Sequence, residues 1–132
     1  MNSIWSTTKN CVTFFDRTDE TGYVSIGPGP ACNSFLGRVG GRQMISLMKN
    51  CLQEIGAIQY ELLHTLGFYH EHTRSDRDDY LWTKWMNIRP TVIADFKIFS
   101  DNKTMKFPYD CDTSTLRMEH ACNKHQRTDN DC

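Results

Sequence analysis

Hydrophobic and polar residues in the first third of the chain follow the short-range patterns of β-strands. Two β-branched and aromatic stretches, CVTFF at 11–15 and YVSIG at 23–27, are separated by the polar run DRTDETG. RQMISL at 42–47 alternates polar and apolar residues, which favours a third strand with one solvated side. GPGPACNSFLGRVGG, between the second and third of these, is rich in Gly and Pro and predicts a loop.

The next pattern is helical. Apolar residues recur at helical spacing from about Leu52 to Leu66, and Gly67 follows where helices commonly end in a left-handed residue. Residues 81–99, LWTKWMNIRPTVIADFKIF, predict short helical turns broken by Pro90, with Trp82 and Trp85 as core aromatics. Beyond residue 100 the chain is polar and irregular and predicts no element. The residues that make the helical pattern are Leu52, Ile55, Ile58, Leu62, Leu63 and Leu66.

Composition limits the class of protein. The chain has 132 residues, 39% of them hydrophobic, and a net charge of -1, which is typical of one folded domain. This charge gives no electrostatic reason to expect nucleic acid or an anionic membrane as a partner. No apolar run has the length that a bilayer-spanning helix needs. We therefore expect neither a nucleic-acid nor a membrane partner.

The cysteine content indicates an oxidising, extracellular compartment. Six cysteines are many for so short a chain. Asn102-Lys103-Thr104 is a sequon for N-glycosylation. The first fifteen residues lack the basic and apolar regions of a signal peptide, so we expect the sequence to be incomplete at its start.

The helical stretch carries the candidate chemistry. Residues four apart lie on one helix face, so Tyr60 and His64 point the same way with Glu61 beside them. A turn at Gly67 would bring His70 back toward the same point. Ligands at these spacings with an adjacent carboxylate suit a catalytic zinc site, in which the metal acidifies water and the glutamate moves its proton. Tyr60 stands where such a site needs its first histidine.

These residues resemble the signature H-E-x-x-H-x-x-G-F-x-H-E-x-x-R-x-D-R of the astacin family of zinc metalloendopeptidases, within the metzincins. CNSFLGRVGGRQMISL and NCVTF are similar to further family segments, and PYD at 108–110 resembles the approach to the Met-turn. Only the first signature position, Tyr60, departs. The matching positions are Glu61, His64, Gly67, Phe68, His70, Glu71, Arg74, Asp76 and Arg77.

The resemblance implies an α+β fold of the metzincin, astacin-like catalytic domain. Mostly the upper subdomain is expected, a twisted mixed sheet with the zinc-motif helix, and the C-terminal subdomain is expected to be truncated. One partial peptidase domain would occupy residues 1–132. The resemblance is clear over about 10–96, and the tail over about 100–132 diverges.

The resemblance also assigns roles. His64 and His70 would be ligands of one zinc ion, Glu61 would be the general base and acid, and Tyr60 would occupy the position of the missing third ligand. An extended peptide or protein substrate would lie along strand 42–47, added antiparallel to the sheet.

Further implied features concern cysteines and a buried acid. Cys32 and Cys51 match a family disulfide, whereas the partner of Cys11 stays open. Glu71 matches a residue that pairs with the mature N-terminus, and because this chain begins too late to offer that partner, an uncompensated acid is expected. The candidate partners of Cys11 are Cys111, Cys122 and Cys132.

Two departures and the apparent lack of the family's ends leave three functions open. Tyr60 replaces a ligand, and Met118, the only methionine after PYD, is out of register with the family's Met-turn. The chain is then a zinc endopeptidase with Tyr60 phenolate as the third ligand, an inactive pseudoprotease that binds peptide, or a non-functional truncated product. Hydrolysis is expected to be impaired or absent.

Several charged and histidine residues have no settled role at this stage. The charged run after His70 suits either a solvated face or a structural role. The remaining histidines receive no role. The two sets are Arg74, Asp76, Arg77 and Asp78, and His72, His120 and His125.

Overall fold

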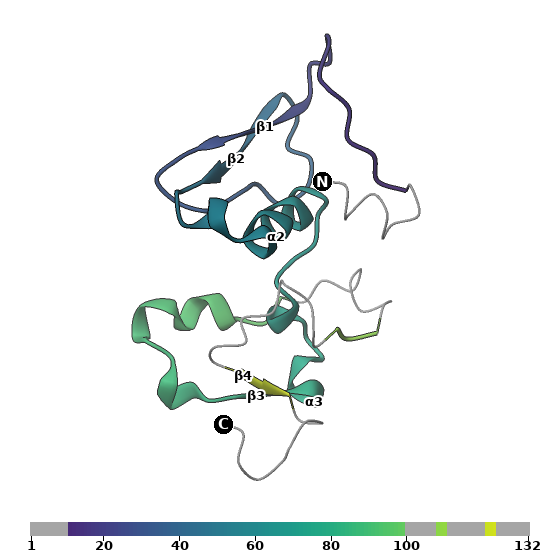
Figure 1. Cartoon of the computed structure of the whole chain (residues 1–132). Helices are drawn as coiled ribbons and strands as arrows, with labels where there is room; N and C mark the ends of the chain where they lie inside the picture. The colour runs from purple at the N-terminus through teal and green to yellow at the C-terminus, as the bar shows by residue number, and fades with distance from the viewer. Residues whose placement is uncertain (1–10, 100–107, 111–120, 124–132) are drawn as a thin grey trace. The chain divides into compact units, whose positions relative to one another are not determined.

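The structure is a computed structural model that describes residues 11–99 and 108–110, and the backbone of 121–123 (Figure 1). The chain divides into two compact units, Met1–Phe68 and Tyr69–Cys132. The described part of each unit is treated by itself below.

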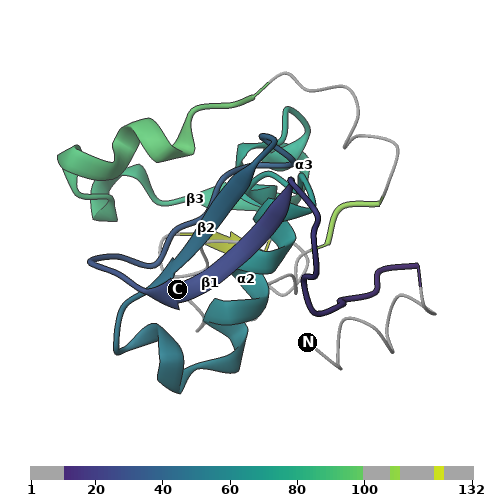
Figure 2. The same ribbon diagram turned by 90° about the horizontal axis from the view of Figure 1, so that it is seen from above.

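A parallel pair of strands forms the sheet of the first unit. β1 (Tyr23–Pro28) pairs with β2 (Arg42–Leu47), in register from Tyr23 opposite Arg42 to Pro28 opposite Leu47 (Figure 2). Asn33 adds an antiparallel bridge to Ser46, so the pairing is mixed. The strands predicted at 23–27 and 42–47 are confirmed.

The strand predicted at 11–15 is wrong. These residues form no strand, and Phe15 is 85% exposed. A strand needs a neighbour for its backbone groups, and the described residues place none beside this stretch. Within this stretch, Val12 packs against the hydrophobic core of the unit. The stretch thus contributes one apolar contact to the core and no strand to the sheet.

The predicted helix is present but begins later than its apolar pattern indicates. α2 spans Ile55–Thr65, and a separate 3-10 turn, η1 (Cys51–Gln53), precedes it. Glu54 between them is extended, with φ -119° and ψ 109°, which interrupts helical hydrogen bonding. Leu52 therefore lies on a turn and is exposed.

The core of the first unit lies between β2 and α2. Ile45, Leu47 and Leu62 are buried together, with Val12, Cys51 and Ile58 packed against them. The expected solvated side of β2 is present only at its start, because Arg42 is exposed and Met44 half-buried but Ser46, on the same side, is buried. Gln43 is a polar residue on the buried side. The side chains of Gln43 and Ser46 make hydrogen bonds to the neighbouring loop, which offsets the cost of burying them.

Gly67 ends α2 as its sequence position predicts. Its φ of 98° lies in the region that side chains disfavour and glycine tolerates. Gly67 and Phe68 donate backbone hydrogen bonds to His64 O and Leu63 O, which satisfies carbonyl groups at the helix end.

The second unit consists of short elements. Proline at the first position of the longest 3-10 turn is favourable, because its missing N–H is not needed there. The helical turns predicted around Pro90 are therefore confirmed. The elements are η2 (Glu71–Thr73), α3 (Arg77–Tyr80), β3 (Leu81–Thr83), η3 (Trp85–Asn87), η4 (Pro90–Phe96) and β4 (Ala121–Asn123), the last antiparallel to β3.

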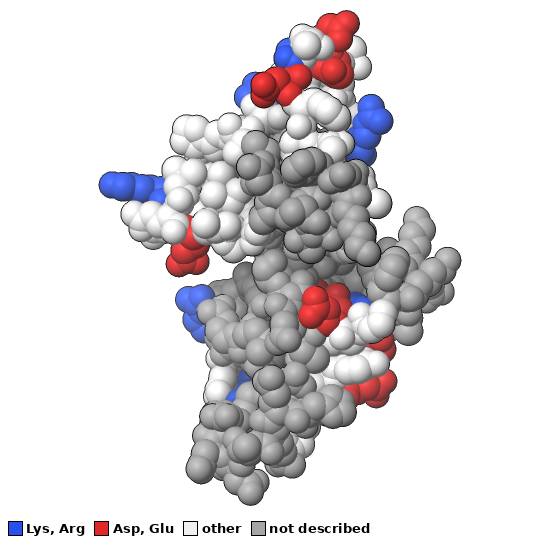
Figure 3. Space-filling view, turned by 45° about the vertical axis from the view of Figure 1, so that its right-hand side comes forward, with Lys and Arg blue, Asp and Glu red and all other residues white. Residues whose placement is uncertain are grey.

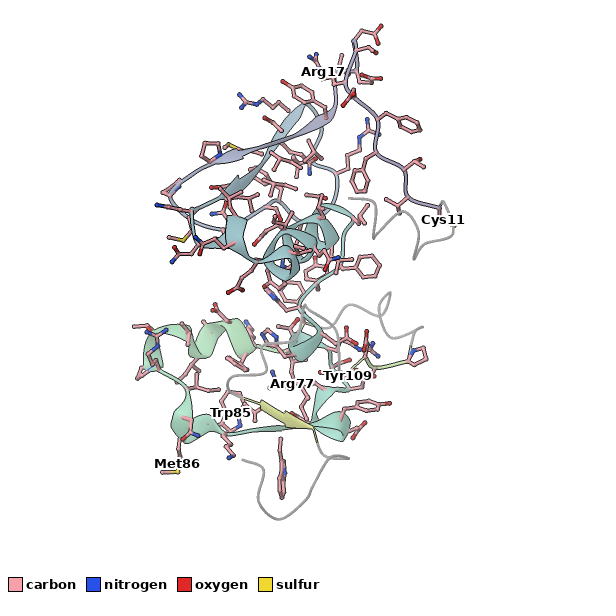
Figure 4. The ribbon with its side chains drawn as sticks, in the orientation of Figure 1. Cys11, Arg17, Arg77, Trp85, Met86 and Tyr109 are labelled. Atoms are coloured by element: carbon pink, nitrogen blue, oxygen red, sulfur yellow. A yellow bond between two sulfur atoms is a disulfide. The ribbon has the colours of Figure 1, made fainter. Side chains whose placement is uncertain are left out.

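Trp82 and Trp85 are not core aromatics as predicted, because each is about half exposed. Leu81 takes the inward side of β3, and alternation along the strand turns Trp82 outward. Trp85 lies beside Arg77, whose guanidinium carbon is 5.5 Å from the centre of the indole ring (Figure 4). Phe96 and Leu81 are the buried residues instead.

The disulfide Cys32–Cys51 is present and confirms that pairing. Cys11 is exposed and forms no disulfide with a described residue. Of its candidate partners, Cys111 and Cys132 lie outside the described residues. Cys122 is described by its backbone alone.

On the face drawn in Figure 3, the described surface carries both positive and negative side chains. Among the described residues, no helix combines the length and apolar character that crossing a bilayer requires.

Candidate functional site

One face of α2 presents Tyr60 and His64, one turn apart, with Glu61 next to Tyr60. The Tyr60 and His64 rings meet edge to face, with their centroids 4.4 Å apart. Glu61 is 3% exposed and His64 is also buried. The spacing predicted from the sequence is therefore present, and the tyrosine ring lies against the imidazole.

His64 is held by contacts on its ring and its backbone. Its Nδ1 lies 2.7 Å from Phe68 O, and a carbonyl oxygen only accepts, so Nδ1 carries the hydrogen. In the neutral ring the lone pair then belongs to Nε2, which is the arrangement of a metal-ligating histidine oriented by a backbone carbonyl. The His64 carbonyl accepts from Gly37 N at 2.8 Å and from Gly67 N at 2.9 Å.

Glu61 is connected to the neighbouring loop through its backbone. Ser34 Oγ donates to the Glu61 carbonyl at 2.9 Å. This bond fixes the middle of α2 against the segment that bridges to β2.

His70 belongs to the second unit and precedes η2. Its carbonyl accepts from both the backbone N–H and the hydroxyl of Thr73, at 3.0 and 2.7 Å. Its ring lies 5.1 Å from the ring of His72, centre to centre. The backbone of His70 is thus fixed by the turn that follows it.

An ion-pair network follows His70. Arg74 Nη1 donates to Glu71 Oε1 at 2.8 Å, and Arg74 Nε and Nη2 donate to the two oxygens of Asp76 at 2.9 and 2.8 Å. Arg74 itself is 6% exposed. The two-bond contact with Asp76 is the geometry in which arginine pairs most strongly with a carboxylate.

The expectation of an uncompensated Glu71 is wrong. Besides the Arg74 pair, Glu71 Oε1 accepts from the backbone N–H of Asp110 at 3.1 Å, and Tyr109 Oη donates to the Glu71 carbonyl at 3.2 Å. Arg74 also lies over the Tyr109 ring, 4.9 Å from its centre. Glu71 is therefore neutralised within its own unit, by a residue three positions later.

Arg77 and His72 are structural residues whose roles the sequence did not assign. Arg77 is buried and its Nη1 donates to the carbonyls of His72, at 2.9 Å, and of Phe96. His72 is 1% exposed, and its Nε2 lies 3.2 Å from Asp95 O. A solvated charged face is thereby wrong for Arg74 and Arg77, although Asp78 is exposed.

The Arg74–Asp76 contact predicts a pH dependence. Hydrogen bonding to Arg74 lowers the pKa of Asp76 below its ordinary value and raises the pKa of Arg74. A lowered pKa in the folded state means that the stabilisation is present above the unfolded pKa, about 4, and is lost as pH falls below it. Asp76→Asn is expected to cost roughly 1–2 kcal/mol at pH 7.

The cost of Asp76→Asn should shrink as pH falls below about 4. Urea denaturation followed through Trp82 and Trp85 fluorescence measures it. Asp79→Asn is the control, since Asp79 is exposed on the same short helix. An equal cost of Asp76→Asn at neutral and acid pH would contradict the assignment.

The predicted peptide-binding edge at 42–47 requires a correction. β2 pairs with β1 along one side, and on its other side Ser46 exchanges both backbone hydrogen bonds with Asn33, at 2.9 and 3.0 Å. The segment around Asn33, and not β2, is therefore the outer one at this position.

The donors for a metal do not match a three-histidine site. A catalytic zinc ion takes three protein ligands, and the helix supplies a phenol at position 60 in place of an imidazole. Among the side chains that the structure describes, no group of three or more His, Cys, Asp or Glu residues could hold a metal ion. The donor set on α2 therefore lacks one imidazole of a three-histidine zinc site.

Comparison with known proteins assigns the chain to a family. The model of the Astacin peptidase family matches residues 2–130. The chain belongs to the astacin family, as the signature around Glu61 and His64 predicts, and its fold is the α+β fold of that peptidase domain.

Individual relatives agree. The chain is 45% identical over 103 residues to an astacin-like metalloendopeptidase of Gallus gallus, a match covering 78% of this chain and 25% of the relative. It is 42% identical over 103 residues to the low choriolytic enzyme of Oryzias latipes, covering 77% of this chain and 37% of the relative. The chain thus spans well under half the length of these relatives.

A solved structure shows the same fold. High choriolytic enzyme 1, a hatching enzyme zinc-protease of Oryzias latipes, superposes with a TM-score of 0.73 at 40% identity. The match covers 80% of this chain and 52% of that chain.

Some predicted residues cannot be placed. Met118, the sequon at Asn102, His120 and His125 lie outside the described residues.

Proposed function

We propose that this chain is an astacin-type metalloendopeptidase domain in which peptide hydrolysis is lost or strongly reduced. The observation that carries the proposal is Tyr60, which stands one turn before His64 with its ring against the imidazole. A phenol reaches farther from the backbone than an imidazole and ligates only after losing its proton, so it does not replace histidine in the same place. The family is zinc-dependent, and zinc retention by this chain is expected to be weak.

The remaining roles follow the family's pattern. His64 and His70 are the proposed zinc ligands, and Glu61 is the proposed general base and acid. The hydrogen bond from His64 Nδ1 to Phe68 O supports the ligand role, because it leaves the lone pair on Nε2. A bound zinc ion would polarise the peptide carbonyl and acidify water. The disulfide and the family together favour an extracellular location.

The proposed partner is an extended peptide or protein segment. Asn33 directs both backbone groups toward Ser46, so in an antiparallel arrangement Cys32 and Ser34 direct theirs outward. A peptide would add its strand there rather than directly along 42–47. Binding by main-chain hydrogen bonds does not require a metal, so a chain without hydrolysis retains this function.

The test uses the full chain, refolded under oxidising conditions with zinc and then dialysed. Elemental analysis measures zinc per chain, and a quenched fluorescent peptide library measures cleavage with and without a chelator. We expect substoichiometric zinc and no chelator-sensitive cleavage.

Glu61→Gln is the matched control, because it removes the proposed base and keeps the shape of the side chain. Cleavage that survives Glu61→Gln belongs to a contaminant. Stoichiometric zinc with chelator-sensitive cleavage that Glu61→Gln abolishes would overturn the proposal and support Tyr60 as a working ligand.

A further inference from the structure

A buried amide side chain on β2 connects the glycine-rich loop to the end of α2. Gln43 is 5% exposed. Its Nε2 donates to Gly37 O at 3.0 Å, and its Oε1 accepts from Val39 N at 3.2 Å. A buried amide that uses both its donor and its acceptor on one loop restricts that loop strongly, since breaking either bond leaves a desolvated polar group.

The residue that Gln43 holds is also the residue that contacts the helix. Gly37 receives Gln43 on its carbonyl and donates its own N–H to His64 O at 2.8 Å. Gly37 has a φ of 66°, and a Cβ added to it would come within 3.8 Å of Gly67 Cα. The loop and the turn after the helix therefore approach each other backbone to backbone.

This approach lies at the end of α2. Gly37 N and Gly67 N both donate to the His64 carbonyl, and the Phe68 N–H donates to Leu63 O instead. The chain turns at Gly67, and the Phe68 carbonyl arrives 2.7 Å from Nδ1 of the same histidine. The backbone bonds at His64 and the hydrogen bond of its ring are parts of one arrangement.

We infer that Gln43 is a positioning residue for the His64 imidazole. Gln43 holds Gly37, and Gly37 in turn holds the end of α2 and the Phe68 carbonyl in place. The position of that carbonyl determines the tautomer of His64, because it favours a hydrogen on Nδ1. Gln43 acts through the loop and does not touch the imidazole. Ser34 is a separate anchor, one turn earlier on the Glu61 carbonyl. The inference does not depend on a bound metal or on hydrolysis.

The experiment reads the tautomer of His64 directly. Long-range proton–nitrogen correlation spectra are recorded on the full chain, labelled with ¹⁵N, at a pH well above that at which histidine ordinarily titrates. The unmodified chain is expected to show the Nδ1-protonated tautomer as the major form. Gln43→Met keeps the length of the side chain and removes both hydrogen bonds.

In Gln43→Met we expect the ratio of Nδ1-protonated to Nε2-protonated His64 to fall about fivefold, the factor that corresponds to one ordinary hydrogen bond. Gln43→Glu, which keeps the acceptor for Val39 and loses the donor to Gly37, is expected to lower the ratio as well. Gln53→Met is the control, since Gln53 is exposed on η1, and it should leave the ratio unchanged.

An unchanged ratio in a folded Gln43→Met variant would overturn the inference, because a merely structural glutamine would change stability without changing the ring. Amide hydrogen exchange of the unmodified chain tests the same inference without any variant. The Gly37 and Val39 amides are expected to exchange slowly. Exchange as fast as that of solvent-exposed loop amides would also overturn the inference.

Discussion

Tyr60→His is expected to raise the zinc affinity of this chain by at least ~10–100-fold. Removing a residue that hydrogen-bonds to a metal ligand commonly lowers metal affinity by this factor. Tyr60→His restores a residue that binds the metal directly, so its effect should be at least as large. Histidines at 60 and 64 would lie four residues apart on one face of α2, which is the spacing of a two-histidine helical zinc motif. The phenol ring that now lies against the His64 ring would be removed.

The affinity is measured by competition with a zinc-binding dye, for the unmodified chain and the variant under the same oxidising conditions. Tyr60→Phe is the matched control, since it keeps the ring and removes the hydroxyl. We expect Tyr60→Phe to bind zinc as the unmodified chain does. Weaker binding by Tyr60→Phe would identify the phenolate as a ligand, and an unchanged affinity in Tyr60→His would show that His64 and His70 are not metal ligands.

Arg74→Met is expected to destabilise the second unit by roughly 3–5 kcal/mol, the range found when one partner of a buried ion pair is removed. Arg74 is the cation that forms ion pairs with both Glu71 and Asp76. Methionine preserves much of the side-chain volume, so the loss reports charge and hydrogen bonding more than packing. Urea denaturation followed through Trp82 and Trp85 fluorescence measures the free energy of unfolding.

Two further variants separate the charge effect from other causes. Arg89→Met removes an exposed arginine of the same unit and is expected to change stability by less than about 0.5 kcal/mol. Adding Glu71→Gln and Asp76→Asn to Arg74→Met should recover part of the loss, because no uncompensated carboxylate then remains. A triple variant no more stable than Arg74→Met would contradict the ion-pair explanation.

The sequence predicts best those elements whose pattern and partners are local. Residues 42–47 form a strand, Gly67 ends the helix in the expected backbone conformation, and Cys32 pairs with Cys51. Helix spacing also places Tyr60 and His64 together. In each case the determining residues lie close in sequence, or the family signature supplies the pairing.

The sequence fails where a residue's state depends on distant neighbours. CVTFF has strand composition, yet no described strand lies beside it. Trp82 and Trp85 are large and apolar, yet Leu81 and Phe96 occupy the interior. The expected partner of Glu71 was the N-terminus of the chain. The structure pairs Glu71 with Arg74, three residues later.

The contacts that hold the backbone and Nδ1 of His64 come from Gly37, Gly67 and Phe68. None of these contacts, which hold the carbonyl and Nδ1 of His64, comes from the side chain at position 60. A histidine codon and a tyrosine codon differ by one base, so an exchange at this position is a small genetic step in either direction. The hydrogen bonds to the carbonyl and Nδ1 of His64 are therefore expected to persist with either residue at position 60.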